Sequence, residues 1–161
     1  MRTDLYNATV ELDWLHHRAH EGKLFTVIDS GAAVVTSRVW LIKNAAAARP
    51  IHIKLFGLCA VASTFSLYEA PTFTVDGSAL TILSVNRGLP GPIPTGVTFF
   101  HTPTKSVNGT LLDVNGNIAA APFTIPSLAS EWILAPNTNY LLIEAHTGTV
   151  QLTVAAVLYE G

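Results

Sequence analysis

Apolar and polar residues alternate in short runs along most of the chain, and these runs predict β-strands. In the stretch from Ile51 to Leu55, His52 and Lys54 occupy every second position, so one face would meet a core and the other solvent or a partner. After Gly22 such runs are rich in Val, Ile, Leu, Thr and aromatic residues and are separated by turn-forming clusters. We expect strands near residues 24–28, 37–43, 51–60, 63–69, 79–85, 96–101, 110–114, 131–134, 139–146 and 149–159.

Turn-forming residues predict how these strands connect. Three pairs tolerate positive φ and commonly close hairpins, namely Asp76-Gly77, Asn108-Gly109 and Asn115-Gly116. Residues 136–139 and 147–148 also form turns, so the C-terminal third is expected to be an antiparallel meander. Residues 87–96, which contain three prolines, and residues 117–130 are expected to be long loops that make contacts.

The strand pattern predicts an all-β fold, most simply a jelly-roll-like β-sandwich, with a small β-barrel as the alternative. Residues 23–161 would form this one domain, and residues 1–22 an N-terminal arm of different texture that could be helical or extended. Five aromatic residues in strand-like runs are expected in the core: Trp40, Phe56, Phe65, Trp132 and Tyr140.

The amino-acid composition predicts a surface with few charged side chains. Apolar residues make up 49% of the chain and charged residues only 12%, against about 25% charged in an average domain. A surface with so few charges is typical of proteins that pack against partners, so we expect an oligomer or a component of a large assembly. With a net charge of -2 and no basic run, nucleic acid is not an expected partner.

No apolar run approaches the roughly 20 residues that cross a bilayer, so a membrane is not an expected partner either. The N-terminus also lacks the apolar core of a signal peptide, which indicates a protein made and kept inside a cell or in something assembled there. The single cysteine, Cys59, lies in an apolar run and is expected to be a buried, unreactive side chain.

The residues that could carry chemistry gather in the arm. His16 and His20 have the i, i+4 spacing of a zinc site, but a zinc-protease motif would place glutamate where His17 stands. We therefore expect no metal site, and the chain has no nucleophile elbow or phosphate loop that would indicate catalysis or cofactor binding. The arm is instead expected to contact a capsid or a sister subunit through Trp14, His16, His17, His20 and Glu21.

Several short stretches together resemble a group of small virion proteins of tailed bacteriophages. These stretches cover residues 16–25, 67–72, 86–87, 131–134, 139–142 and 158–160. The resemblance implies a jelly-roll-like capsid decoration (cement) protein, usually a trimer, on the outer surface of the head. The chain departs from that pattern in its proline-rich loop at 88–94 and its alanine-rich segment at 45–48.

The function that follows from this resemblance is structural and not enzymatic. A homotrimer would bind the major capsid protein and stabilise the head shell, after assembly in the host cytoplasm. One alternative is a head-fibre, neck or tail-associated virion protein. An alternative of another class is a carbohydrate-binding β module, because jelly rolls often bind sugars.

Overall fold

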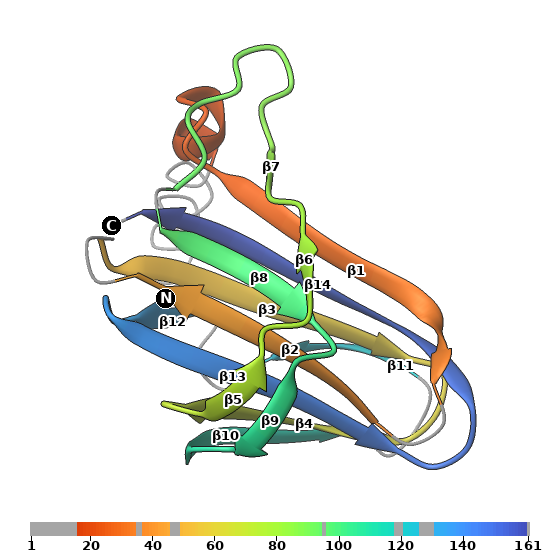
Figure 1. Cartoon of the computed structure of the whole chain (residues 1–161). Coiled ribbons are helices and arrows are strands. Elements are labelled where there is room, and N and C mark those ends of the chain that lie inside the picture. The colour runs from red at the N-terminus through yellow and green to blue at the C-terminus, as the bar shows by residue number, and fades with distance from the viewer. Residues whose placement is uncertain are drawn as a thin grey trace, which may run out of the picture.

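The computed structural model describes residues 16–34, 37–45, 49–94, 96–117, 121–125 and 131–160, and strands dominate this part of the chain (Figure 1). The helical residues within it are 16–20. The predicted all-β class is confirmed.

Two antiparallel sheets pack face to face. Sheet A has the order β11-β3-β14-β1-β7, with β12 also paired to β3, and sheet B has the order β10-β4-β13-β2-β8-β6. The strands of sheet A are β1 (Phe25–Val34), β3 (Ile51–Cys59), β7 (Leu83–Ser84), β11 (Ala121–Ile125), β12 (Trp132–Leu134) and β14 (Val150–Glu160). Those of sheet B are β2 (Ser37–Asn44), β4 (Ser63–Glu69), β6 (Ser78–Leu80), β8 (Val97–His101), β10 (Thr110–Asn117) and β13 (Thr138–His146).

The connectivity of the principal strands is that of a jelly roll. Going along the chain, β1, β2, β3 and β4 alternate between the sheets, β10 stays beside β4 in sheet B, and β11, β13 and β14 alternate again. Numbered 1 to 8 in that sequence, they lie in the orders 1-8-3-6 and 2-7-4-5, which is the double Greek-key arrangement. The two sheets do not join into a closed barrel in the described part of the chain, so the sandwich prediction is confirmed.

The same connectivity explains three local predictions that are wrong. The C-terminal strands do not form a meander, because β12 and β14 belong to sheet A and β13 to sheet B. Asn115-Gly116 lies inside β10, where it pairs with Phe65 and Thr64 of β4 instead of closing a hairpin. The segment expected to be a loop at 117–130 contains β11, which pairs with β3. In each case, pairing between strands that are distant in the sequence decides the structure, and the local sequence signal does not.

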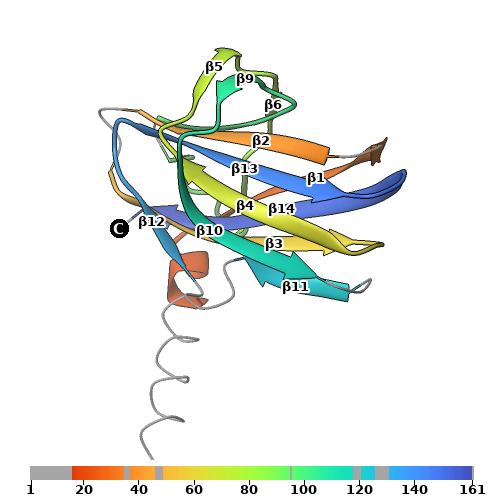
Figure 2. The same ribbon diagram turned by 90° about the horizontal axis from the view of Figure 1, so that it is seen from below.

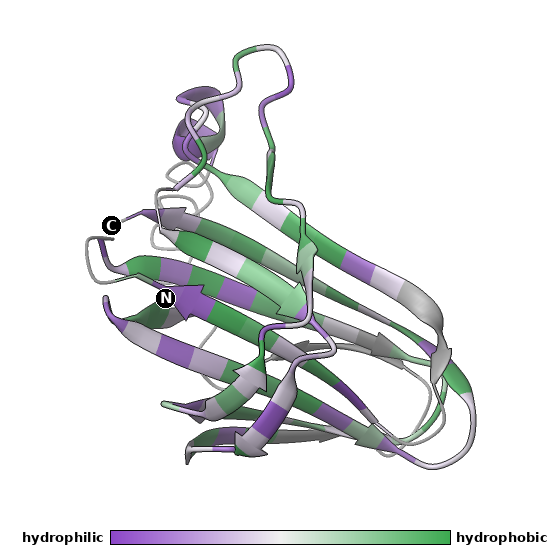
Figure 3. Cartoon of the chain, in the orientation of Figure 1, coloured by the Kyte–Doolittle hydropathy of each residue, from purple (hydrophilic) through white to green (hydrophobic). Residues whose placement is uncertain are grey.

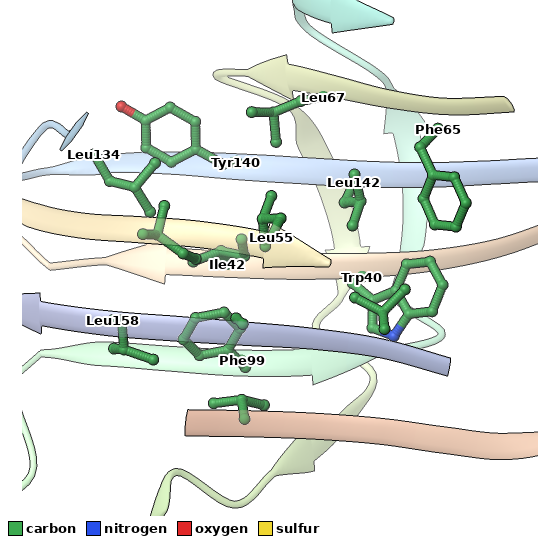
Figure 4. Packing of buried hydrophobic residues seen from close by; sticks show 14 of the residues in the cluster. Trp40, Ile42, Leu55, Phe65, Leu67, Phe99, Leu134, Tyr140, Leu142 and Leu158 are labelled. Carbon is green, nitrogen blue, oxygen red and sulfur yellow. The ribbon is translucent and has the colours of Figure 1, made fainter. Parts of the chain in front are cut away.

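The interior is filled by alternate side chains of both sheets (Figure 4). Trp40 and Phe65 stack with ring centroids 6.5 Å apart, and Tyr140 is also buried, as predicted. Trp132 is half-buried and packs against the cluster. The prediction for Phe56 is wrong: Leu55 points inward, so Phe56 points outward and is 37% exposed.

A separate two-stranded ribbon covers part of the outer face of sheet B. It consists of β5 (Thr72–Val75) and β9 (Thr104–Val107), which were not predicted, and it lies above β2 in Figure 2. Leu41 and Leu141 face away from the central core and yet are 0% exposed. The Lys43 side chain helps to hold the ribbon, since its Nζ lies 2.9 Å from Asp76 Oδ2. Sheet B is therefore covered on both faces near β2.

Candidate functional site

The end of the arm is a short helical turn that stops at Gly22. Lys23 N donates to Arg18 O and Gly22 N donates to Ala19 O, with Gly22 at φ +70°. This pair of bonds with a left-handed glycine is the Schellman ending of a helix. The turn therefore has a defined ending, which leads directly into β1.

This helical turn is bound to the proline-rich loop that follows β7. Asn86 Nδ2 donates to the carbonyl oxygen of His20 at 3.1 Å, and Asn86 Oδ1 accepts bonds from the backbone N–H groups of Gly88 and Leu89. The backbones of Gly22 and Gly91 meet so closely that a Cβ on Gly22 would lie 2.6 Å from Gly91 N. Residues 16–22 and 85–94 thus form one unit, which we call the projection.

The projection extends beyond one end of the sandwich and exposes apolar side chains (Figure 1). Leu89 is 64% and Ile93 52% exposed, and Val85 is also exposed. Figure 3 shows hydrophobic stretches on both limbs of this loop. An ordered loop that presents apolar side chains to water is typical of a contact surface.

The predicted contact residues of the arm lie on the polar side of the projection. His16 and His20 bring their Nε2 atoms within 3.0 Å, and His17 Nε2 lies 3.1 Å from Glu21 Oε1. Lys23 Nζ lies 3.1 Å from Glu21 Oε2, and this hydrogen bond is the main reason that the pKa of Glu21 is lowered. Four of the five predicted residues are therefore together, and Trp14 lies outside the described residues.

A second apolar surface lies on the outer face of sheet A. The strand register places Ile28, Ala155 and Phe56 side by side across β1, β14 and β3. A neighbouring row contains Leu83 and Val157, on either side of Thr26. Ile28 is 58% exposed. We call this surface the apolar face. It consists of Ile28, Phe56, Leu83, Ala155 and Val157, with Ile133 farther along opposite His52, and Thr26 and Lys54 lie in the row of Val157.

The outer faces of the two sheets differ in how far their apolar side chains are exposed to water. On the outside of sheet B, Leu41 and Leu141 are 0% exposed, whereas Ile133 on the outside of sheet A is 60% exposed. A further set of apolar side chains, Val107, Leu111 and Val114 on β9 and β10, is at least half exposed. We call this set the β10 patch. Besides the projection, the described residues thus form one apolar surface on sheet A and another on β10 of sheet B and β9 of the ribbon.

The buried carboxylate of Asp29, in the interior of the sandwich, is hydrogen-bonded to two side chains. Asp29 accepts bonds from Arg38 Nη2 at 3.1 Å and from Trp40 Nε1 at 2.6 Å. Among the described residues, it is the charged one that lines a small cavity of about 20 Å³ between the sheets. The other lining residues are apolar or aromatic, and Asp29, held by Arg38 and Trp40, contributes to packing and to rigidity.

The aromatic residues bear on the carbohydrate alternative. Sugar-binding sites favour exposed aromatic rings, but among the described residues Trp40, Tyr140 and Tyr159 are buried, and Trp132 and Tyr68 are half-buried. Tyr159 donates to Glu131 at 2.7 Å and stacks on His52, whose Nδ1 also contacts Glu131. Among the described residues, no Trp or Tyr ring is exposed enough to form an open platform, and the exposed ring of Phe56 lies on the apolar face.

Comparisons with known proteins provide no functional assignment. No protein-family model matches the chain, and no curated protein matches it. A crystal structure of hydroquinone 1,2-dioxygenase from Sphingomonas sp. TTNP3, with 4-hydroxybenzoate bound, is similar over 84% of this chain and 58% of that chain, with 11% identity and a TM-score of 0.29. The chain thus spans less than two thirds of that enzyme, and a TM-score this low supports no argument about function. Among the described residues, no helix is long and apolar enough to cross a membrane.

Sequence reasoning found the arm residues and the proline-rich loop but missed how they are joined. The Asn86 side chain could have indicated a turn, because asparagine commonly accepts bonds from the backbone two and three residues later. Its partner His20 is 66 residues away, and no local signal specifies such a contact. The apolar face was missed because its members come from five strands, and only the register brings them together.

Proposed function

We propose that the chain is a homotrimeric capsid decoration protein that binds the major capsid protein on the outer surface of a phage head. The observation that carries this proposal is the apolar face, a sheet surface that the described part of the chain leaves uncovered. Its exposure is costly in water, at about 25 cal/mol per Å² of apolar area. A neighbouring copy that covers it removes part of that cost, so assembly of the ring is favoured.

Two different apolar surfaces support a cyclic trimer over a simple dimer. A two-fold dimer uses the same patch on both subunits, whereas a three-fold ring joins one patch to a different patch on the next subunit. The apolar face on sheet A and the β10 patch on sheet B fit the second arrangement. We propose that they meet at each subunit boundary of the trimer.

The projection is then free to contact the capsid. It lies at one end of the sandwich, contiguous with β7 at the edge of sheet A, and it combines exposed Leu89 and Ile93 with the histidines of the arm. Interface centres of this kind, with apolar anchors and a polar rim, bind without requiring high charge. The resemblance to virion proteins points to the same partner.

Co-sedimentation with undecorated capsid shells tests this proposal directly. The shells are assembled from the major capsid protein encoded in the same genome. The wild-type chain is expected to pellet with the shells and to saturate, and Leu89→Ser/Ile93→Ser is expected to weaken binding at least tenfold. Val75→Ser is the matched control, because Val75 is an equally exposed apolar residue on β5, far from the projection in Figures 1 and 2.

The outcomes separate the hypotheses. Loss of binding in the projection variant with retention in the control supports the proposal. A wild-type protein that stays in the supernatant at all concentrations contradicts it, and a wild-type protein that binds immobilised glycans in place of shells would favour the carbohydrate-binding alternative.

A further inference from the structure

Three chemically different side chains meet inside the sandwich at the end of β3. Glu144 and His146 are two residues apart on β13, so both point into the interior, and Cys59 reaches them from the facing sheet. His146 Nδ1 lies 2.8 Å from both carboxylate oxygens of Glu144, and Cys59 Sγ lies 3.8 Å from Glu144 Oε1. All three donor atoms lie within 4.8 Å of one another.

This cluster is completely enclosed. The exposed fractions are 1% for Cys59, 0% for Glu144 and 8% for His146. Burial raises the pKa of the Glu144 carboxyl, while the contacts with His146 and Cys59 act in the opposite direction. Enclosing a carboxylate, an imidazole and a thiol together is expensive unless charge is compensated.

Ser63 provides an independent observation at the same place. It is 5% exposed, and the β4–β13 register places it directly opposite His146 on the inward face. Its Oγ is buried and has no hydrogen-bond partner within the described part of the chain. Buried hydroxyl groups without partners are rare, so this one leaves a polar group available to a species bound beside His146.

The donor set and spacing match a transition-metal centre. Sulfur, imidazole nitrogen and carboxylate oxygen together suit zinc, whose bonds to them are about 2.0–2.3 Å long. Ligand atoms around a tetrahedral zinc ion therefore lie about 3.2–3.6 Å apart. The His146–Glu144 and Cys59–Glu144 separations, 2.8 and 3.8 Å, bracket that range, and every pair lies within 4.8 Å.

We propose that Cys59, Glu144 and His146 bind one Zn²⁺ ion, with the fourth position on the side of Ser63. On binding, the Cys59 thiol releases its proton and the thiolate takes up the metal. The ion would link β13 of sheet B to β3 of sheet A, where it would stabilise the sandwich. This site differs from the sequence expectation of no metal, and it is separate from the histidine pair of the arm.

The first test uses the wild-type chain. Because the structure encloses the cluster, the protein is unfolded in denaturant with a chelator and refolded with Zn²⁺ or Co²⁺ alone. Elemental analysis is expected to give about one zinc per chain after dialysis. Cobalt is expected to give a thiolate-to-metal charge-transfer band in the near ultraviolet, and since Cys59 is the single cysteine, that band reports this site alone.

Variants identify the remaining ligands. Cys59→Ala and His146→Gln are expected to lose the bound metal, and His146→Gln also the cobalt band. His16→Gln/His20→Gln, which removes the exposed histidine pair, is the matched control and should retain both. Zinc without a cobalt–thiolate band, retention of metal in the Cys59 and His146 variants, or loss of metal in the control would overturn the proposal. So would a refolded wild-type chain that holds no metal.

Discussion

Asn86 donates a hydrogen bond from its side chain to the backbone carbonyl oxygen of His20, 66 residues earlier, at 3.1 Å. The same side chain accepts two bonds from its own loop. One asparagine therefore orders the proline-rich loop and attaches it to the arm. This relationship makes the projection a defined surface and not two independent loops.

Replacing Asn86 is expected to loosen the projection while leaving the sandwich intact. Asn86→Ala removes all three bonds, so trypsin should cleave faster after exposed Arg87, with little change in the midpoint of thermal unfolding. Asn86→Asp keeps the acceptor and loses the donor, so it should be intermediate. Equal cleavage rates in the wild type and Asn86→Ala would contradict this role.

The apolar face should control the oligomeric state. Ile28→Ser/Phe56→Ser is expected to convert the trimer into monomers at micromolar concentration, measured by light scattering, because it removes apolar contact area without disturbing the core. Val75→Ser should leave the mass unchanged. A wild-type protein that is already monomeric would count against the trimer, and a variant that remains trimeric would count against this face.

The two described tryptophans should respond differently to the same change. Trp40 Nε1 donates to buried Asp29, so Trp40→Phe leaves a carboxylate short of a partner and should lower the free energy of unfolding by about 1–3 kcal/mol or more. Trp132 Nε1 is buried and has no partner among the described residues, so Trp132→Phe should cost less. Urea unfolding of both variants measures the difference, and equal losses would show that the Asp29 bond contributes nothing.

Alkaline pH should destabilise the fold through Tyr140. Burial raises the pKa of Tyr140 above its usual 10.0, and its bond to Glu69 adds to this, against the opposing Ala135 N–H group. The folded state therefore keeps a proton that the unfolded chain loses, so stability falls as pH rises above about 10. Tyr140→Phe should show a weaker fall in thermal stability between neutral and alkaline pH. The same slope in both proteins would contradict this prediction.

Much of the fold could be predicted because alternation is a local property. In Ile51 to Leu55 the pattern gives both the strand and its inward face, and β2, β4, β13 and β14 were predicted for the same reason. The alternation does not show which strands pair with each other in the sheets, so the pairing could not be predicted in this way. Asn115-Gly116 has the composition of a hairpin turn, but β4 offers it partners and it continues a strand.

The sites were less predictable than the strands. His16, His17, His20 and Glu21 stand together in the sequence and could be proposed as a group. Cys59 was expected to be a buried, unreactive side chain, and no sequence pattern linked it to His146, because their proximity arises only when β3 and β13 pack across the core. The same holds for the apolar face, whose residues lie between positions 28 and 157.

The number of copies bound to each capsid tests the central claim most directly. Quantitative gels of purified virions, or electron cryomicroscopy of them, count that number. A decoration protein that follows the symmetry of the shell should be present in copies on the order of hundreds, grouped in threes on the outer surface. A handful of copies confined to the neck or tail, or none on the virion, would contradict the account.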